Sequence, residues 1–307
     1  IVEDSAGNLI VGEGNLGFVK ILTADNTVDR TFAAGNRNFR GSAADTCTLD
    51  GTNNSIVRTI NNLGLATNVK GVSGDVIYGA DLGSNNGKIV GINTSGKCIE
   101  VITYAELGGF RPMAMEVRTI NGNDHLFASG RWWGGNDWRK YFYTKNLTTG
   151  DSLTCGSNYG GSLGTVIQSG IRLTVDNSGG FVYYNYQGHI HGYALTKTGN
   201  NYCPSDTGRD KYYAQGNSNT SHRKATAIQV SPDSDSTVYV TSFNHGVVQK
   251  VSLTGDNTLT SVILAGRKRN AENTASAGAL SAAEVNLREP KALFVTSTKV
   301  WVSDNKA

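Results

Sequence analysis

The stretch Glu289-Pro290-Lys291-Ala292-Leu293-Phe294-Val295, followed by Val300-Trp301-Val302-Ser303-Asp304, contains the pattern that decides the fold. A proline opens an alternating apolar strand, a short polar turn follows, and a second strand of β-branched and aromatic residues returns. The first strand has counterparts at 111–117, 170–175 and 225–230. The chain is therefore built from repeats of one β-hairpin unit.

The second strand of this unit recurs, and the spacing of its copies gives the length of the repeat. Its copies are 9–12, 76–79, 126–129, 181–184, 238–241 and 300–303. Their first residues are separated by 67, 50, 55, 57 and 62 positions. Such an interval is typical of one four-stranded blade of a β-propeller, extended by loops.

A third strand follows the first five copies and carries two large apolar residues three positions apart. These pairs are Val19 and Leu22, Ile89 and Ile92, Trp138 and Tyr141, Ile190 and Tyr193, and Val248 and Val251. Because side chains alternate along a strand with a period of two, a spacing of three predicts a bulge or a strong twist in each third strand. A polar turn and a shorter fourth strand complete the unit.

We predict an all-β fold, a single β-propeller of six blades of four antiparallel strands with the last blade incomplete, and seven blades as the alternative. The expected blades span 1–58, 59–108, 109–165, 166–222, 223–287 and 288–307. The 38 Gly, 4 Pro and 17% charged residues agree with short strands joined by tight turns. Since the last copy stops after its second strand, we expect 1–307 to be part of a longer chain or to borrow strands.

The last copy also resembles the NHL-repeat β-propeller family. The similarity lies in Leu264-Ala265-Gly266, in the loop that ends Leu287-Arg288-Glu289-Pro290, and in the apolar strand that ends at Asp304. Thr31-Phe32-Ala33-Ala34-Gly35 repeats the Ala-Gly element and Arg111-Pro112 repeats the proline element. The resemblance implies a propeller that binds proteins, RNA or glycans, or that forms the scaffold of an enzyme.

Charge and hydropathy exclude some classes of partner. The formal net charge is +3 and the basic residues are scattered, whereas binding to nucleic acid needs a concentrated basic surface. No apolar run approaches the roughly 18 residues that a membrane span requires. We therefore expect neither nucleic acid nor membrane insertion. Since the chain begins at Ile1 without a signal-like segment, it is expected to be processed or a piece of a longer protein.

Four cysteines favour two disulfides and an extracytoplasmic location, whether secreted, periplasmic or at the cell surface, with free buried thiols as the alternative. They are Cys47, Cys98, Cys155 and Cys203. Equivalent positions on neighbouring blades are expected to be more than about 7 Å apart, too far for a bridge. Pairing should then use loops, with Cys47 reaching Cys98 and Cys155 left to Cys203.

Metal and cofactor motifs are weak in this sequence. His189 and His191 are two apart on a strand and project from one face, but two ligands do not make a metal site. The Asp-rich segments 176–179 and 233–236 lack a calcium-binding loop and are expected to be turns. We expect no cofactor, with Ca²⁺ or another metal as the alternative.

The segment between the second and third strands of the third copy is the best candidate for a binding site. Its candidate residues are Arg131, Trp132, Trp133, Asn136, Asp137 and Arg139. Tryptophan rings beside planar polar groups suit sugars or a protein interface. The alternative is that both rings fold back over a neighbouring blade.

These features favour a non-enzymatic binding or adhesion module of an exported or cell-surface protein, which recognises a glycan or a protein through loops on one face. No catalytic residue stands out. A hydrolase or lyase with a metal in the central channel is a second class, and a structural component of an envelope or filament assembly is a third.

Overall fold

The computed structural model describes most of the chain. The described residues are 1–13, 17–29, 60–81, 87–131, 140–155, 172–186, 189–205, 211–213, 225–242, 246–253, 259–266 and 287–304. All regular secondary structure in them is β-strand. None of these residues forms a helix long and apolar enough to cross a membrane.

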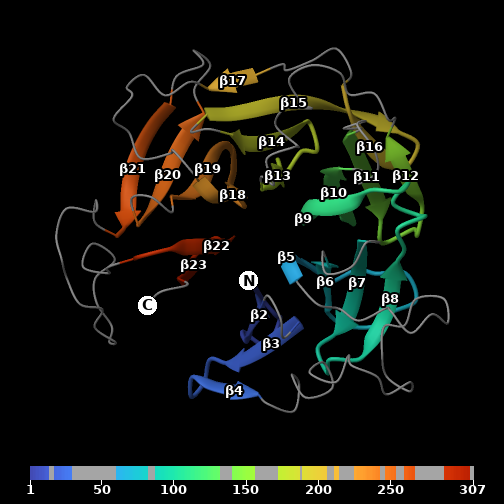
Figure 1. The fold of residues 1–307 in the computed structure, drawn as a ribbon, viewed down its shortest axis with the longest axis horizontal. Helices are drawn as coiled ribbons and strands as arrows, with labels where there is room; N and C mark the ends of the chain where they lie inside the picture. The colour runs from blue at the N-terminus through green and yellow to red at the C-terminus, as the bar shows by residue number, and fades with distance from the viewer. Residues whose placement is uncertain are drawn as a thin grey trace. The chain divides into compact units, whose positions relative to one another are not determined.

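The strands form six sheets in chain order (Figure 1). The first three sheets contain β1 (Val2–Glu3), β2 (Leu9–Glu13), β3 (Gly17–Leu22) and β4 (Thr27–Asp29); β5 (Ile60–Ala66), β6 (Val76–Asp81), β7 (Lys88–Asn93) and β8 (Cys98–Ile102); and β9 (Arg111–Ile120), β10 (Asn123–Arg131), β11 (Lys140–Asn146) and β12 (Ser152–Cys155).

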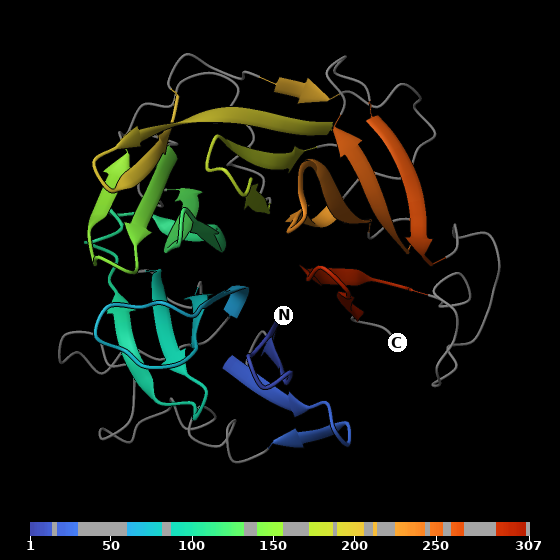
Figure 2. The ribbon, with the colours of Figure 1, turned by 180° about the vertical axis from the view of Figure 1, so that it is seen from behind.

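The remaining sheets complete the described chain, and Figure 2 shows the same strands from behind. They contain β13 (Leu173–Val175), β14 (Phe181–Tyr186), β15 (His189–Thr198), β16 (Asn201–Pro204) and β17 (Lys211–Tyr213); β18 (Ala225–Ser231), β19 (Ser234–Ser242), β20 (Val247–Leu253) and β21 (Leu259–Ala265); and β22 (Pro290–Val295) with β23 (Val300–Asp304).

Each sheet is a meander of antiparallel neighbours, and the fold is an all-β propeller. The structure gives five full blades, so the predicted count of six, with seven as the alternative, is corrected. The last sheet is partial, because β22 and β23 pair only with each other among the described strands.

The chain divides into two compact units, each with its own core. One contains Ile1–Gly170 and Thr196–Asp206, and the other contains Ile171–Leu195 and Thr207–Ala307. The single-domain boundaries expected from the sequence stay a prediction.

The six predicted second strands are confirmed as β2, β6, β10, β14, β19 and β23. The predicted bulge does not lie in the third strands, because β3, β7, β11, β15 and β20 pair with their second strands in unbroken register. Where β7 and β20 change register, they do so against the fourth strands β8 and β21, which hold the extra residues Ile99 and Leu264. The alternative of a strong twist stays a prediction. In β7, the residues from Lys88 to Ile92 are all buried. Apolar residues three apart therefore arise because both faces of the strand are covered.

The irregular pairings lie mainly near the start of the first strand. One extra residue interrupts the register in four sheets, namely Asn61, Met113, Thr226 and Lys291. A bulge bends its strand and increases the local twist. Its recurrence therefore changes the direction of the first strand at a similar place in four of the six sheets.

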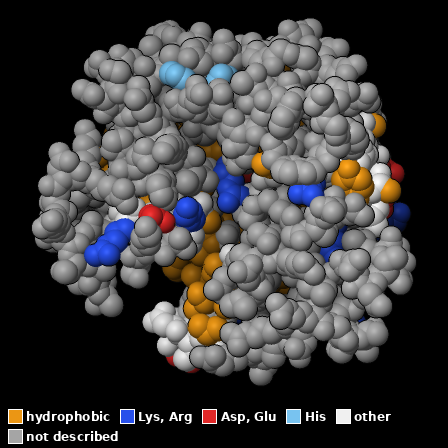
Figure 3. Space-filling view, viewed as in Figure 1, with side chains coloured by type: hydrophobic (Ala, Val, Ile, Leu, Met, Phe, Trp, Pro, Cys, Tyr) orange, Lys and Arg blue, Asp and Glu red, His pale blue; other side chains and the backbone are white. Residues whose placement is uncertain are grey.

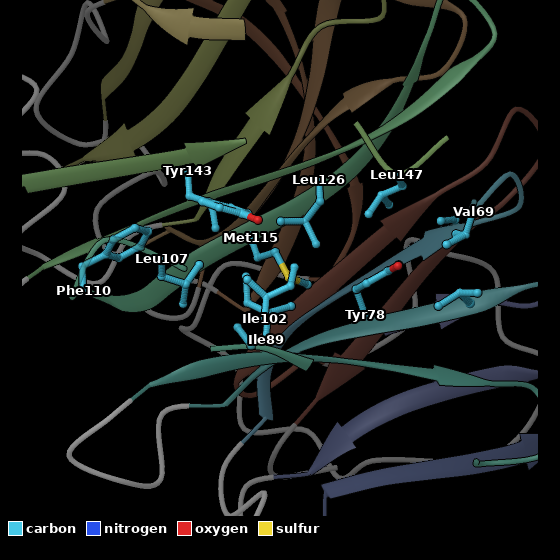
Figure 4. Close-up of a cluster of buried hydrophobic side chains, with 14 residues drawn as sticks. Val69, Tyr78, Ile89, Ile102, Leu107, Phe110, Met115, Leu126, Tyr143 and Leu147 are labelled. Atoms are coloured by element: carbon cyan, nitrogen blue, oxygen red, sulfur yellow. The ribbon is translucent and has the colours of Figure 1, made fainter. Parts of the chain in front are cut away.

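The core of the first unit lies between the sheets β5–β8 and β9–β12 (Figure 4). Met115 and Leu126 project from β9 and β10 toward Ile89 and Tyr78 of the preceding sheet. The Tyr78 hydroxyl donates a 2.6 Å hydrogen bond to Glu100 Oε2, and Lys145 Nζ pairs with Glu100 Oε1. Burial, reinforced by the Glu100 carboxylate, raises the pKa of Tyr78 above its ordinary value. An ion pair therefore closes one edge of this core.

Aspartates at the beginning of second strands connect consecutive sheets within each unit. Asp75 Oδ2 accepts the Ser5 N–H at 2.6 Å, and Asp124 Oδ2 accepts the Thr67 N–H at 2.7 Å. In the second unit, Asp235 Oδ1 accepts the Asn177 N–H at 2.6 Å. In all three cases the carboxylate bonds a main-chain amide in the turn after the first strand of the preceding sheet. Charge-assisted bonds of this kind are stronger than neutral ones and fix one sheet against the next.

In the second unit, the residues that resemble the NHL repeat lie close together in space. Gly246 has a φ of +59° and Gly266 a φ of +84°, which is the left-handed region that favours glycine. A Cβ at Gly266 would overlap the Gly246 carbonyl oxygen, and a Cβ at Gly246 would overlap the Leu287 carbonyl oxygen. The Asp304 carboxylate accepts the N–H groups of Arg288 and Glu289 at 2.6 and 2.7 Å. The Ala-Gly element, the loop before Pro290 and the terminal Asp are thus parts of one closely packed corner.

The predicted Cys155–Cys203 disulfide is confirmed, with a Cα–Cα distance of 5.6 Å. The expectation that equivalent positions on neighbouring sheets are too far apart is wrong, because this bridge joins the outer strands β12 and β16 directly. Cys98 is also disulfide-bonded. Cys47, its expected partner, lies outside the described residues.

Removing the bridge with Cys155→Ser and Cys203→Ser is expected to lower the free energy of unfolding by about 3 kcal/mol, because it frees the denatured chain. The bridge closes a sequence separation of 48 residues. Urea denaturation of the double variant and the oxidised parent would measure the difference. Equal midpoints and slopes for both proteins would contradict the expectation.

Candidate functional site

The two ends of each sheet carry different connections. At one end of each sheet, the first strand begins and the second strand connects to the third; we call this the loop end. We call the opposite end the turn end. At the turn end the connections are short, such as 121–122 between β9 and β10. At the loop end, β4 is joined to β5 through 30–59, and β21 to β22 through 266–289. Binding residues concentrate on loops held by a rigid scaffold, so the loop end is the place to look for a site.

Three basic residues lie side by side at the loop end of the sheet β9–β12. Arg131, the last residue of β10, is paired directly opposite Arg111 of β9 and directly opposite Lys140 of β11. The three residues are therefore register neighbours on three adjacent strands. We call Arg111, Arg131 and Lys140 the basic strand ends.

Close backbone contacts fix the position of Arg111. A Cβ at Gly130 would overlap the Arg111 carbonyl oxygen. A Cβ at Gly87 would lie 2.8 Å from Pro112 Cδ and 2.9 Å from Arg111 Cα. The start of β9 therefore packs tightly against β10 and against the start of β7, which follows Gly87.

The other hairpins between second and third strands end differently. The corresponding last pairs are Glu13 with Gly17, Asp81 with Lys88, Tyr186 with His189, and Ser242 with Val247. Among these five described hairpins, only β10–β11 ends in two basic residues. The basic strand ends are therefore particular to one sheet and are not a by-product of the repeat.

A basic residue also stands at or just before the first strand in other repeats. Arg172 precedes β13 and Arg288 precedes β22 by two positions. Burial lowers the pKa of Arg172 to about 10. This recurrence was visible in the sequence, but the sequence prediction had not used it. Figure 3 shows Lys and Arg side chains among the described side chains on the face it displays.

The candidate binding segment lies only partly within the described residues. Arg131 belongs to β10, while Trp132, Trp133, Asn136, Asp137 and Arg139 lie outside the described part of the chain. The strands on either side are placed, because β10 and β11 pair from His125 with Asn146 to Arg131 with Lys140. The antiparallel pairing of β10 with β11 on either side of the segment is therefore confirmed, and the segment as a binding site stays a prediction.

His189 and His191 both lie on β15, as predicted, with His189 half-buried and His191 buried. The part of the chain that the structure describes contains no group of three or more His, Cys, Asp or Glu side chains arranged to hold a metal ion.

His125 is a buried histidine that the sequence did not single out. It is 2% exposed, and its ring centroid lies 5.1 Å from that of Tyr202, nearly perpendicular to it. Its Nδ1 atom is buried without a hydrogen-bond partner. Burial lowers the pKa of His125 to about 4, against a smaller opposing effect of Asp124. A neutral imidazole among aromatic rings indicates a core residue at this position.

The Asp-rich segment 176–179 forms a turn, as predicted, whereas in the segment 233–236 only Asp233 lies in the turn and the other three residues begin β19. Asp176 Oδ1 accepts the Gly180 N–H at 2.7 Å, and the Asp176 carbonyl accepts the Gly179 N–H at 3.2 Å. Burial is the main cause that raises the pKa of Asp176 above its ordinary value, and nearby Asp235 adds to it.

Comparison with known proteins identifies the fold but no family. No family model matches the chain, and no curated protein matches it, so the NHL resemblance is not confirmed. An auxiliary nutrient binding protein from Bacteroides thetaiotaomicron is similar in structure, with a TM-score of 0.51, 12% identity, and coverage of 97% of this chain and 63% of that one.

Two further structures have lower scores. The Dos1 propeller has a TM-score of 0.43 and 11% identity over 81% of this chain and 53% of that one. An ancestral GH74 enzyme has a TM-score of 0.41 and 13% identity over 81% of this chain and 32% of that one. The chain spans less than two thirds of each of these proteins. At such identities the comparisons show the propeller fold alone.

Proposed function

We propose that this chain is a non-enzymatic binding module of an exported protein, which recognises a glycan or protein ligand through the loop end of the sheet β9–β12. The observation that supports the proposal most is the continuous register of β10 and β11 as far as Arg131 and Lys140, the two residues that the 132–139 segment joins in the sequence. A rigid hairpin base limits the conformational freedom that a binding loop loses, and tryptophan and arginine are frequent energetic anchors.

Two further observations agree with this proposal. The disulfide between Cys155 and Cys203 fits an oxidising compartment, where such bonds persist. One protein of similar fold is an auxiliary nutrient binding protein, so a propeller with only 12% sequence identity to this chain has a binding role. Adhesion at a cell surface is one form of this function.

The test is a screen of the purified chain against immobilised glycans, followed by affinity measurements on the best ligand. Trp132→Ala and Trp133→Ala are each expected to weaken binding about tenfold or more, because aromatic anchors dominate such interfaces. Val262→Ala is the matched control, since Val262 is a 65% exposed apolar residue on β21, in a different sheet. It should bind as the parent does.

The same samples separate binding from catalysis. Mass spectrometry of a bound oligosaccharide after long incubation should return the intact ligand. Cleaved products would contradict a non-enzymatic binding module and support the alternative of a hydrolase or lyase. Full affinity in both tryptophan variants, with circular dichroism showing a native fold, would remove the 132–139 segment from the site.

A further inference from the structure

We infer that two copies of this chain associate through the outer strand β21, whose outer edge pairs antiparallel with the same edge of a second copy. This contact is independent of the proposed binding function, because β21 belongs to a different sheet from β10 and β11. Two features of β21 carry the inference, namely the exposure of its side chains and its uncharged sequence.

The strand β21 is the outermost strand of the sheet β18–β21 (Figure 1). It pairs with β20, and no other described strand pairs with it. The consecutive residues 260–263 are all exposed, with Val262 at 65% and Ile263 at 42%. Because successive side chains of a strand point to opposite faces, exposure of consecutive residues means that both faces are open here. A further strand therefore has access to the outer edge of β21.

The sequence of β21 favours pairing with such a strand. Its seven residues, Leu-Thr-Ser-Val-Ile-Leu-Ala, include no charged residue, no proline and no glycine. Valine, isoleucine and threonine are β-branched and are enriched in strands. Proteins protect the exposed edges of sheets with short strands, charged side chains, proline or a covering segment, and a long apolar edge without these devices is a site of association.

The outer strands β4, β8, β12 and β16 carry the protections that β21 lacks. The strand β4 has only three residues and ends at Asp29, and β8 contains the charged Glu100. The strands β12 and β16 have four residues each, and the Cys155–Cys203 disulfide joins them. The exposed edge of β21 is therefore particular to one sheet and is not a general property of the repeat.

A second copy of the chain is the partner that this edge fits. Two identical strands that pair antiparallel are related by a two-fold axis, so the same surface supplies both sides and each contact is made twice. Because β21 is uncharged, no like charges meet when it pairs with itself. The inner edge of β21 is occupied by β20, so this pairing is complete with two copies.

The regular part of β21 determines how the two copies align. The extra residue Leu264 interrupts the pairing with β20, whereas Leu259 to Ile263 pair with it without interruption. Symmetric pairing of these five residues places Ser261 opposite the partner's Ser261 at the two-fold axis. A contact of this length is smaller than the roughly 800 Å² per partner of a stable complex. We therefore expect a weak dimer with a dissociation constant of about 10 to 100 μM.

Sedimentation velocity of the purified chain between about 1 and 500 μM tests this expectation. The parent should be monomeric at the lowest concentration and mainly dimeric at the highest. Ser261→Lys and Ser261→Glu should each raise the dissociation constant at least about tenfold, because two like charges then lie opposite each other. Ser261 is exposed, so neither variant buries a charge in the free monomer.

An equimolar mixture of the two variants should associate at least as tightly as the parent, because lysine then lies opposite glutamate. This recovery distinguishes a broken contact from a misfolded variant. Val28→Lys and Val28→Glu are the matched controls, since Val28 is a 47% exposed apolar residue on the outer strand β4. Both should dimerise as the parent does.

Three results would overturn the pairing of β21 with itself. The first is a parent that stays monomeric at about 500 μM, even if it binds a strand of another protein. The second is a dimer that both Ser261 variants retain, since the contact would then lie elsewhere. The third is a mixture of the two variants that stays monomeric. The glycan screen is unaffected by these results, because it tests a different sheet.

Discussion

Gly130→Ala is expected to lower the free energy of unfolding by about 4 kcal/mol or more, which is a large fraction of the stability of an ordinary domain. A Cβ at this position would overlap the carbonyl oxygen of Arg111, on the neighbouring strand β9. A Cβ atom has no rotamer by which to escape, so the two strands would have to separate. Phe110 would be disturbed too, because its ring carbon Cδ2 would lie 2.6 Å from the new atom.

Gly122→Ala is the matched control for this prediction. Gly122 lies in the turn between the same two strands and has a φ of +77°, but nothing lies within 4 Å of the Cβ position. It should therefore cost only about 1 kcal/mol, the ordinary penalty of a left-handed conformation. Urea denaturation followed by circular dichroism would compare the two. A smaller loss in Gly130→Ala than in Gly122→Ala would contradict the close contact between β9 and β10.

The repeat could be predicted from the sequence because it depends on local pattern. The second strands, with their runs of β-branched and aromatic residues, all appear where the spacing placed them, from β2 to β23. The third strands were also located, but their irregularity was misjudged. Val248 and Val251 are both buried on β20, which has covered residues on both faces. A period of two applies only when one face is exposed, and the sequence does not say how many faces are covered.

The disulfide also depends on packing that the sequence does not specify. Cys155 and Cys203 were paired correctly, yet by a wrong assumption about the distance between outer strands. Their Cα separation depends on how two sheets pack, which no local pattern specifies. The bonds that Asp75, Asp124 and Asp235 make across consecutive sheets were likewise invisible, because each joins segments more than fifty residues apart.

The candidate site was predicted in part. Aromatic and basic residues between β10 and β11 were visible in the sequence, but Arg111 and Lys140 were not connected with them. The alignment of Arg111 with Arg131 depends on the extra residue Met113 in β9, and that of Lys140 depends on the register of β11 with β10. A shift of one position in a strand would turn its residues to the other face. A bulge of this kind has no clear signature in the sequence.

Asp124→Ala is expected to lower the free energy of unfolding by about 4 kcal/mol, because several donors lose a buried, charged acceptor at once. Asp124 is 1% exposed. Its Oδ2 accepts the N–H groups of Thr67 and Asn68 at 2.7 and 2.8 Å, and its Oδ1 accepts the Thr119 hydroxyl at 2.6 Å. The first two bonds come from the preceding sheet, so the substitution weakens the contact between sheets as well as the strand itself.

Two control variants separate the effect of these bonds from the loss of a carboxylate as such. Asp25 accepts two hydrogen bonds from Thr27, but it is exposed, so Asp25→Ala should leave the urea midpoint unchanged. Asp124→Asn keeps the shape and one acceptor oxygen, and it should lose about half as much stability as Asp124→Ala.

Hydrogen exchange would locate the damage. In Asp124→Ala, the amides of Thr67 and Asn68 should lose protection first, since they lose the carboxylate that accepts them. The Asn177 amide, bonded to Asp235 in the other unit, should keep its protection under native conditions. Unchanged protection at Thr67 and Asn68 would mean that water replaces the carboxylate without loss. The bonds between sheets would then be incidental to stability, and apolar packing around Met115 and Leu126 would have to hold the first unit together.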